Sequence, residues 1–161
     1  MMDVRQPNMV TLDGNDPDTV SEFARRLIDS FGLTGWTFAF DDAKRRMGSC
    51  RYGTRQITLS RHFVKLNPPA EIDETVRHEI AHALVGPGHG HDATWQAMAR
   101  RVGARPERCG DAEMPDGNWK AECPACRRTF SRHRRPRRMT GWFCRDCGPR
   151  RGVLIWALGD G

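Results

Sequence analysis

The chain has 161 residues, which fits one domain or one small domain with an appended unit. Its apolar content of 38% allows a modest core, and the absence of any run of about 18 apolar residues excludes a membrane-spanning helix. The net charge of +6 is unevenly spread: residues 120–151 hold eleven Lys/Arg and two Asp/Glu, so they carry +9 and the rest of the chain −3. This asymmetry is typical of a segment that meets an anionic polymer.

The first residues, MMDVRQPNMVTLDGNDPD, contain acids and no apolar stretch. We therefore expect no secretory signal, and we expect residues 1–15 to form a flexible tail. A cytoplasmic protein is the resulting expectation. In that compartment the six cysteines are metal ligands or free thiols rather than disulfides.

A helix is predicted directly after the tail, because six apolar residues recur there at helical spacing. Two start signals compete. One is Asp16 followed by Pro17, and the other is the capping box Thr19-x-x-Glu22. Gly32 marks the end of the helix. The apolar face consists of Val20, Phe23, Ala24, Leu27, Ile28 and Phe31.

Two stretches that follow are predicted to form strands. The first is WTFAFDD, residues 36–42. The second is RMGSCRYGTRQITLS, residues 46–60, which gives one or two strands, with Ile57 and Leu59 in alternation. Together they predict a short β-hairpin or small sheet.

A second helix is predicted to begin at Asn67, whose side chain can cap it and whose two following prolines are tolerated in a first turn. It ends near Gly86. A third helix runs from near Asp92 to Gly103. Residues 104–121 lack periodicity and contain proline, glycine and acids, which is typical of a linker. The second helix is expected to bury Ile72, Val76, Ile80 and either Ala83 or Leu84, and the third Trp95, Met98 and Val102.

The second helix carries the pattern His-Glu-x-x-His. His78 and His82 are four residues apart, so their imidazoles point the same way and can reach one zinc ion at about 2.0–2.1 Å. Glu79 is rotated by about 100° from His78, which makes it a poor ligand but a suitable base for a metal-bound water. The pattern therefore predicts a metal site with its general base. A helix that carries these residues by chance is the alternative.

A hydrolytic zinc site needs a third protein ligand and one open position, and two histidines follow in the sequence. We favour His91, because it precedes Asp92 at the start of the third helix, which Trp95 can anchor to the core. His89 lies in a glycine-flanked loop, where it stays solvated, touches substrate or donates to the oxyanion. Asp92 is expected to be an N-cap or a partner that holds a histidine. Tyr52, the only tyrosine, lies in the predicted hairpin and is no clear oxyanion donor.

Two Cys-x-x-Cys units, Cys123/Cys126 and Cys144/Cys147, are separated by seventeen residues. Four thiolates at this spacing close a structural tetrahedral zinc site, which replaces the core that so short a unit cannot build. Two redox dithiols are the alternative, but no strand–helix pattern surrounds them. The remaining cysteines are expected to be ordinary reduced thiols: Cys50, in or near a strand core, and Cys109.

The segment between the two units, RRTFSRHRRPRRMTGWF, is strongly cationic. Arginine forks pair with phosphates, so we expect backbone-directed binding of DNA, with a solvated loop as the alternative. Phe130, Trp142 and Phe143 are interleaved; packing inside the unit is favoured over stacking on bases. The arginines are Arg127, Arg128, Arg132, Arg134, Arg135, Arg137 and Arg138.

The segment HEIAHALVGPGHGHDATW resembles the active-site segment of the SprT-like, Spartan-related zinc metalloprotease family. In that family a Gly-His unit followed four residues later by an aromatic residue supplies the third ligand. Gly90-His91 with Trp95 matches this spacing, and His89 does not. The stretch from 46 to 60 resembles the family's hairpin, and a C-terminal zinc ribbon is similar to that of many members. The resemblance implies DNA-associated or DNA-crosslinked proteins as substrates.

These observations together predict an α+β protein: a small zincin-like metalloprotease domain, residues 16–103, with three helices and a short hairpin or sheet. The linker 104–121 then leads to a four-cysteine zinc ribbon, residues 122–158. We expect one catalytic and one structural Zn²⁺, protein substrates, DNA as a partner and no membrane contact. The alternatives are a non-enzymatic zinc-containing nucleic-acid-binding module, or a protease whose arginines bind an acidic protein surface.

Overall fold

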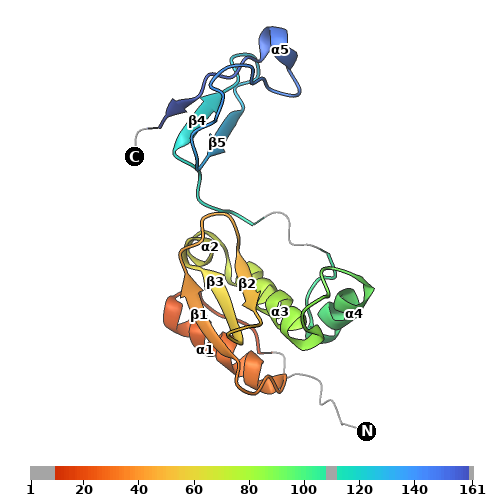
Figure 1. Ribbon diagram of the computed structural model, residues 1–161. Helices are drawn as coiled ribbons and strands as arrows, with labels where there is room; N and C mark the ends of the chain where they lie inside the picture. The colour runs from red at the N-terminus through yellow and green to blue at the C-terminus, as the bar shows by residue number, and fades with distance from the viewer. Residues whose placement is uncertain (1–9, 108–111, 160–161) are drawn as a thin grey trace. The chain divides into compact units, whose positions relative to one another are not determined.

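The computed structural model describes residues 10–107 and 112–159, which divide into two compact units with the boundary between Pro115 and Asp116 (Figure 1). Each unit has its own three-stranded sheet and its own core. Within the described ranges no helix is long and apolar enough to cross a membrane.

The first unit is built from a mixed sheet and four helices. The strand order is β1-β3-β2; β1 runs parallel to β3 and β2 antiparallel to it, so β2 and β3 form the predicted hairpin. The elements are α1 (Pro17–Ser30), β1 (Thr37–Asp41), β2 (Gly48–Arg51), β3 (Gln56–Ser60), α2 (Arg61–Leu66), α3 (Pro69–Val85) and α4 (Ala93–Val102).

The start of α1 is decided by Asp16. Its side chain accepts a hydrogen bond of 3.0 Å from the backbone N–H of Thr19, and Pro17 occupies the first helical position. This uses the first of the two competing start signals, because a carboxylate oxygen satisfies a backbone donor that the first turn leaves open. The predicted apolar face of α1 is buried against the core up to Ile28.

The prediction that Asn67 caps the second helix is wrong. A short helix that the sequence analysis missed, α2, comes first, and Asn67 ends it; α3 then begins at Pro69. The Asn67 side chain donates to the carbonyl oxygens of Phe63 and Glu113, both at 2.8 Å, and accepts from the backbone N–H of Glu113 at 2.9 Å. A helix of six residues is too short to show apolar periodicity.

The core of the first unit lies between the sheet and the helices. Ile72, Val76 and Ile80 of α3 are fully buried, while Ala83 and Leu84 pack at its edge. Trp95 and Val102 of α4 are buried as well, and the helix ends at Gly103 in the left-handed region, with φ 83°. This arrangement places the centre of α3 next to β2 and to α4.

The predicted linker is shorter than residues 104–121. Ala104 and Met114 pack against the first core, and Trp119 already lies in a strand of the second unit. That unit has the sheet order β5-β4-β6 and a small core around two of the cysteines. Its elements are β4 (Trp119–Glu122), β5 (Thr129–Arg132), α5 (Gly148–Arg151) and β6 (Ala157–Leu158).

Candidate metal sites

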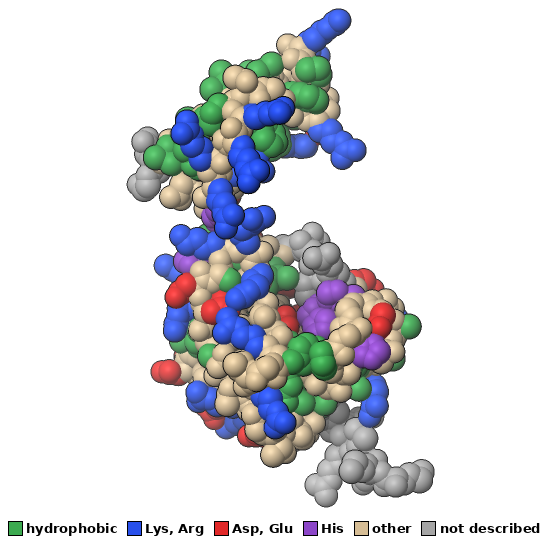
Figure 2. Space-filling view, viewed as in Figure 1, with side chains coloured by type: hydrophobic (Ala, Val, Ile, Leu, Met, Phe, Trp, Pro, Cys, Tyr) green, Lys and Arg blue, Asp and Glu red, His purple; other side chains and the backbone are tan. Residues whose placement is uncertain are grey.

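Three histidines of the first unit converge on one point. His78 and His82 lie one turn apart on α3, and His91 directly precedes the N-cap of α4. The Nε2 atom of His91 lies 3.0 Å from that of His78 and 3.4 Å from that of His82. Nitrogens held tetrahedrally at 2.0–2.1 Å from zinc stand about 3.3 Å apart, so the three rings fit one ion. Figure 2 shows histidine side chains gathered in a hollow of this surface.

The electrostatics of this cluster favour neutral rings. Burial, together with the neighbouring histidines, lowers the pKa of His78 to about 3. Burial and His91 lower the pKa of His82 to about 4. Both imidazoles are therefore uncharged at neutral pH, which is the form that offers a lone pair to a metal.

The indole ring of Trp95 packs against the imidazole rings of all three histidines. Its side chain is fully buried, and its ring centroid lies 4.6, 5.2 and 4.5 Å from those of His78, His82 and His91. The backbone N–H of Trp95 donates to Asp92 at 2.9 Å, so the start of α4 is fixed as well. The helix thus presents one large aromatic surface on which the three ligand candidates rest.

His89 is not part of the cluster. Its Nδ1 atom lies 2.8 Å from a carboxylate oxygen of Asp92, on the loop side of the site. Asp92 therefore has both of the roles considered for it: one oxygen caps α4, and the other holds a histidine, although not a ligand candidate.

Glu79 lies beside the three histidines but faces β2. Its carboxyl group is buried and accepts a hydrogen bond from the backbone of Cys50. Burial raises the pKa of Glu79 to about 8, against the opposing effects of the Arg46 charge and the Cys50 hydrogen bond. Gly48 allows this approach: a Cβ there would lie 3.1 Å from Cγ of Glu79 and 2.9 Å from the carbonyl oxygen of Thr58. Glu79 is thus not a member of the group of three nitrogen donors.

Tyr52, which the sequence does not identify as an oxyanion donor, lies next to the histidine cluster in the structure. Its hydroxyl donates to the backbone carbonyl of His82 at 3.0 Å and so ties the β2–β3 turn to the last turns of α3. Burial raises the pKa of Tyr52 to about 12 and that of the adjacent Cys50 thiol to about 12. Both side chains therefore stay protonated beside Glu79. The contact joins residues thirty positions apart, so no local pattern signals it.

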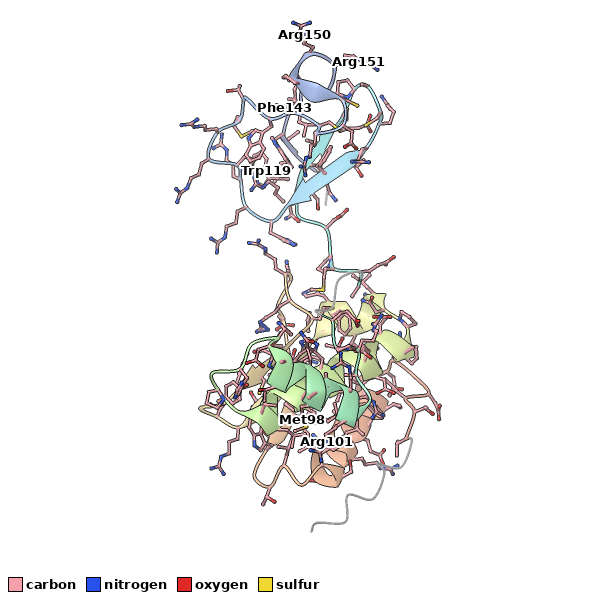
Figure 3. The ribbon with its side chains drawn as sticks, turned by 90° about the vertical axis from the view of Figure 1, so that its right-hand side faces the viewer. Met98, Arg101, Trp119, Phe143, Arg150 and Arg151 are labelled. Atoms are coloured by element: carbon pink, nitrogen blue, oxygen red, sulfur yellow. The ribbon has the colours of Figure 1, made fainter. Side chains whose placement is uncertain are left out.

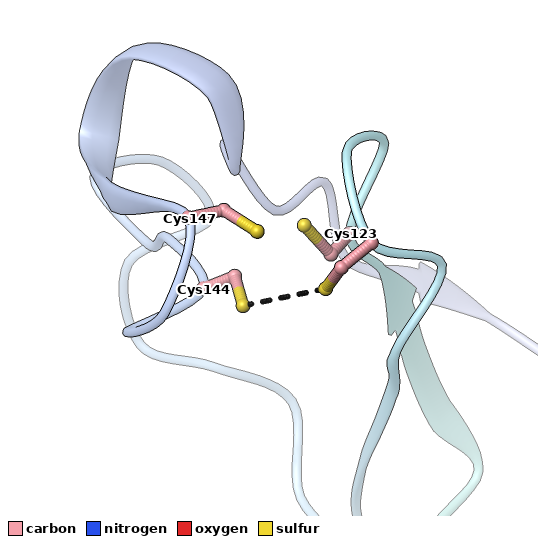
Figure 4. Close-up of side chains that lie close together, drawn as sticks. Cys123, Cys144 and Cys147 are labelled. Carbon is pink, nitrogen blue, oxygen red and sulfur yellow. Dashed lines mark hydrogen bonds between the residues drawn. The ribbon is translucent and has the colours of Figure 1, made fainter.

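The second unit gathers four sulfur atoms (Figure 4). The Sγ atoms of Cys126 and Cys144 are 3.8 Å apart, and the Sγ atoms of all four cysteines lie within 4.8 Å of one another. Tetrahedral Zn–S bonds of 2.3 Å require about 3.8 Å between sulfurs, so the donor set fits zinc. Hydrogen bonds from the backbone of Cys126 lower the pKa of the Cys123 thiol, whereas a hydrogen bond with the Cys126 side chain raises the pKa of the Cys147 thiol to about 12. Cys109 lies outside the described residues.

The two Cys-x-x-Cys units, which we call knuckles, have the same backbone turn. The residue after each second cysteine has a positive φ, 62° at Arg127 and 72° at Gly148. The backbone N–H of Cys123 donates to the carbonyl of Arg128 at 2.9 Å, and that of Cys144 to Gly152 at 2.7 Å. Each turn thus directs a pair of sulfurs to the same point, with Cys123 and Cys144 fully buried.

The seven arginines between the knuckles are all exposed, but they differ in their partners. Arg127 pairs with Glu122 at 2.9 Å, and Arg128 with Asp146 at 2.5 Å. No acidic side chain of the described residues lies within ion-pair distance of the other five, which are Arg132, Arg134, Arg135, Arg137 and Arg138.

The aromatic residues of this segment are divided between core and surface. Trp142 and Phe130 pack against the small core, whereas Phe143 is 49% exposed. The guanidinium of Arg132 lies 4.6 Å from the Trp142 ring centroid, beside an open pocket of about 480 Å³ that Arg137 also lines. Figure 3 shows Arg150 and Arg151 on α5 and Phe143 on the same unit. Cations thus border an aromatic surface, an arrangement typical of sites for nucleic acids.

Comparison with known proteins bears on the first unit. The model of the SprT-like family matches residues 18–114, from the first turn of α1 to one residue short of the end of the first unit. Neither the curated proteins nor the solved structures gave a match. The matched range contains the three histidines, Glu79 and Trp95, and it covers more than half of the chain. The chain therefore belongs to the SprT-like family.

Proposed function

We propose that this protein is a zinc-dependent metalloendopeptidase that cleaves proteins associated with or crosslinked to DNA. The observation that carries the proposal is the division of roles on α3. Two histidines of this helix join His91 in a set of three nitrogen donors, whereas the carboxyl group of Glu79, between them in sequence, accepts a hydrogen bond from the backbone of Cys50 on β2. Three protein ligands leave a fourth position open, which is typical of catalytic rather than structural zinc.

The three histidines would hold zinc, which would supply a water of lowered pKa and polarise the carbonyl of the peptide bond. The protein's own contribution is Glu79. The carboxylate accepts the proton of the attacking water and later delivers a proton to the leaving amine. The backbone N–H of Cys50 and the nearby Arg46 stabilise the charged form of Glu79 against its burial. Trp95 keeps the three imidazoles in place throughout.

The second unit is proposed to be a structural zinc ribbon that attaches the protease to DNA. Its four cysteines leave no open position once they hold one ion. The exposed arginines contact phosphates without reading sequence, so binding weakens as salt rises. Attachment raises the local concentration of proteins bound to the same DNA. The cytoplasm is the compartment that we expect.

The principal competing function is a non-enzymatic DNA-binding module, which the arginine surface alone would support. Cleavage of a DNA-binding substrate protein should be measured with and without DNA. The enzymes compared are wild type, Glu79→Gln, and Arg137→Glu/Arg138→Glu. We expect DNA-stimulated cleavage by wild type and none by Glu79→Gln. The double variant should retain the basal rate and lose the stimulation. Absence of cleavage by wild type under all conditions would support the binding module. A basal rate that an acidic protein stimulates as well as DNA would show an acidic protein partner.

A further inference from the structure

We propose that the first unit carries a site of its own for single-stranded nucleic acid, separate from the ribbon, at the end of its sheet. The inference rests on the nucleic-acid partner of the proposed function and adds a contact on the unit that holds Glu79. We call it the sheet-end site. It consists of a small apolar pocket and five exposed cations: Lys44, Arg45, Arg46, Arg61 and Lys65.

The topology brings these cations together. Because β1 and β3 are parallel, their carboxyl ends lie side by side, with Asp41 paired to Ser60. Residues 42–47 cross this end on the way to β2. Ser60 fixes the crossing: its hydroxyl donates to the carbonyl of Ala43 at 2.5 Å, and its N–H to that of Met47 at 2.7 Å. Since α2 begins at Arg61, the loop and this helix present their cations at the same end.

The sheet-end site sets its five cations against three nearby acids: Asp41, Asp42 and Asp16, which stands between the pocket-lining residues Asn15 and Pro17. Arg46 is bound to Asp41 through two contacts of 2.9 and 2.8 Å. Arg61 lies 3.6 Å from Asp42, whose side chain is 81% exposed, and an exposed pair of this kind contributes little to stability. A phosphate can therefore replace Asp42. No described acidic side chain lies within ion-pair distance of the remaining cations, Lys44, Arg45 and Lys65.

The pocket specifies the kind of polyanion. It has a volume of about 380 Å³, and Phe40 and Val64 form apolar walls between Arg61 and Lys65. The Arg61 guanidinium lies 5.3 Å from the Phe40 ring centroid. An unpaired base can enter such a pocket while its phosphates meet the cations. A duplex keeps its bases stacked, and an acidic peptide would use the cations alone. The arrangement therefore favours a single strand.

The position of the site connects it with catalysis. The loop that carries Lys44, Arg45 and Arg46 continues directly into Gly48, which lies against Glu79. Phe40 of β1 lines the pocket and Glu79 packs on Gly48 of β2, which is two strands away in the sheet order β1-β3-β2. A nucleic-acid strand held by these cations would extend along residues 44–46 towards Gly48, the residue that lies against Glu79. Proteins attached to that strand would be presented close to the base.

The test compares two charge reversals in the full chain with zinc bound. Arg61→Glu/Lys65→Glu alters the site, and Arg100→Glu/Arg101→Glu alters the last turn of α4 by the same charge (Arg101 in Figure 3). The probe is a fluorescent single-stranded oligothymidylate of about 12 nucleotides. We expect the site variant to bind about tenfold more weakly, with a salt slope shallower by about 1.4 for two lost phosphate contacts. The control should change less than about twofold.

Folding of the site variant is checked by circular dichroism, and a glutamate in the first turn of α2 suits the helix dipole. The milder Arg61→Gln/Lys65→Gln should weaken binding about threefold. Equal losses in the site variant and the control, or no loss in either, would overturn the proposal. So would an equal dependence of poly-glutamate binding on Arg61 and Lys65. If Arg137→Glu/Arg138→Glu alone reduces binding, the sheet-end site is absent while the ribbon proposal stands. Absence of cleavage by wild type would overturn the protease without affecting the binding result.

Discussion

The support that Trp95 gives to the three histidines leads to a quantitative prediction. Trp95→Ala removes a fully buried side chain that contacts all three rings at 4.5–5.2 Å between centroids. Truncation of a buried Trp costs about 3–5 kcal/mol of unfolding free energy, within the 5–15 kcal/mol typical of domains, so the variant should fold at low temperature. Loss of the surface under the ligands should lower zinc affinity at this site about 10–100-fold, as for other groups that orient ligands.

The control is Phe63→Ala. Phe63 is equally buried, but it lies in α2, and its truncation carries a similar cost of about 3–5 kcal/mol. Zinc affinity is measured by competition with a chromogenic chelator, and stability by denaturant unfolding. We expect both variants to lose stability and only Trp95→Ala to lose affinity for the zinc that the histidines hold. Wild-type zinc affinity in Trp95→Ala, or equal losses in both variants, would refute the supporting role.

Three further substitutions, the last with a matched control variant, test other contacts. Gly48→Ala places a methyl group 3.1 Å from Cγ of Glu79 and 2.9 Å from the carbonyl of Thr58, so the cleavage rate should fall while the zinc content equals that of wild type; an unchanged rate would contradict the proposed dependence of catalysis on the close packing of β2 on Glu79. Tyr52→Phe removes the hydrogen bond to the His82 carbonyl and should cost about 1 kcal/mol in urea unfolding, whereas equal midpoints would show that this bond contributes nothing. Gly152→Ala places a Cβ 2.8 Å from that of Cys147 and should weaken zinc binding by the ribbon alone. Gly148→Ala is the control, because a Cβ at Gly148 meets no atom within 4 Å. It should cost only the backbone strain of a φ of 72°, about 1–2 kcal/mol of unfolding free energy. A larger loss of zinc affinity in Gly148→Ala than in Gly152→Ala would contradict the proposed packing of Gly152 on Cys147.

Much of the first unit could be predicted from the sequence because its helices are long and regular. The faces of α1, α3 and α4 follow from apolar spacing, and Asp16, Asp92 and Gly103 mark ends by local chemistry. The helix α2 was missed because six residues give no periodic window, and its presence reassigned Asn67 from a start signal to an end signal. The predicted linker, residues 104–121, is too long because residues 112–118 show no apolar periodicity, although Ala112 and Met114 pack against the first core.

In the candidate site, too, contacts within one helix could be predicted from the sequence, whereas contacts between distant segments could not. The spacing of His78, Glu79 and His82 lies within one helix, so the sequence alone places them. The contact of Tyr52 with His82 joins a hairpin turn to a helix end, which no local pattern encodes. The sheet-end site was also missed, because the net charge outside the ribbon is −3 and its cations come from two separate segments.

The most direct test of the account is the rate of peptide-bond cleavage by wild type and Glu79→Gln at matched zinc content, with a DNA-bound protein as substrate and mass spectrometry of the products. Removal of a general base reduces rates by about 10²–10⁴-fold, and the histidines should still hold their zinc in the variant. We predict defined fragments from wild type and a rate at least about 100-fold lower from Glu79→Gln. Equal rates from the two proteins would contradict the assignment of Glu79 as the base.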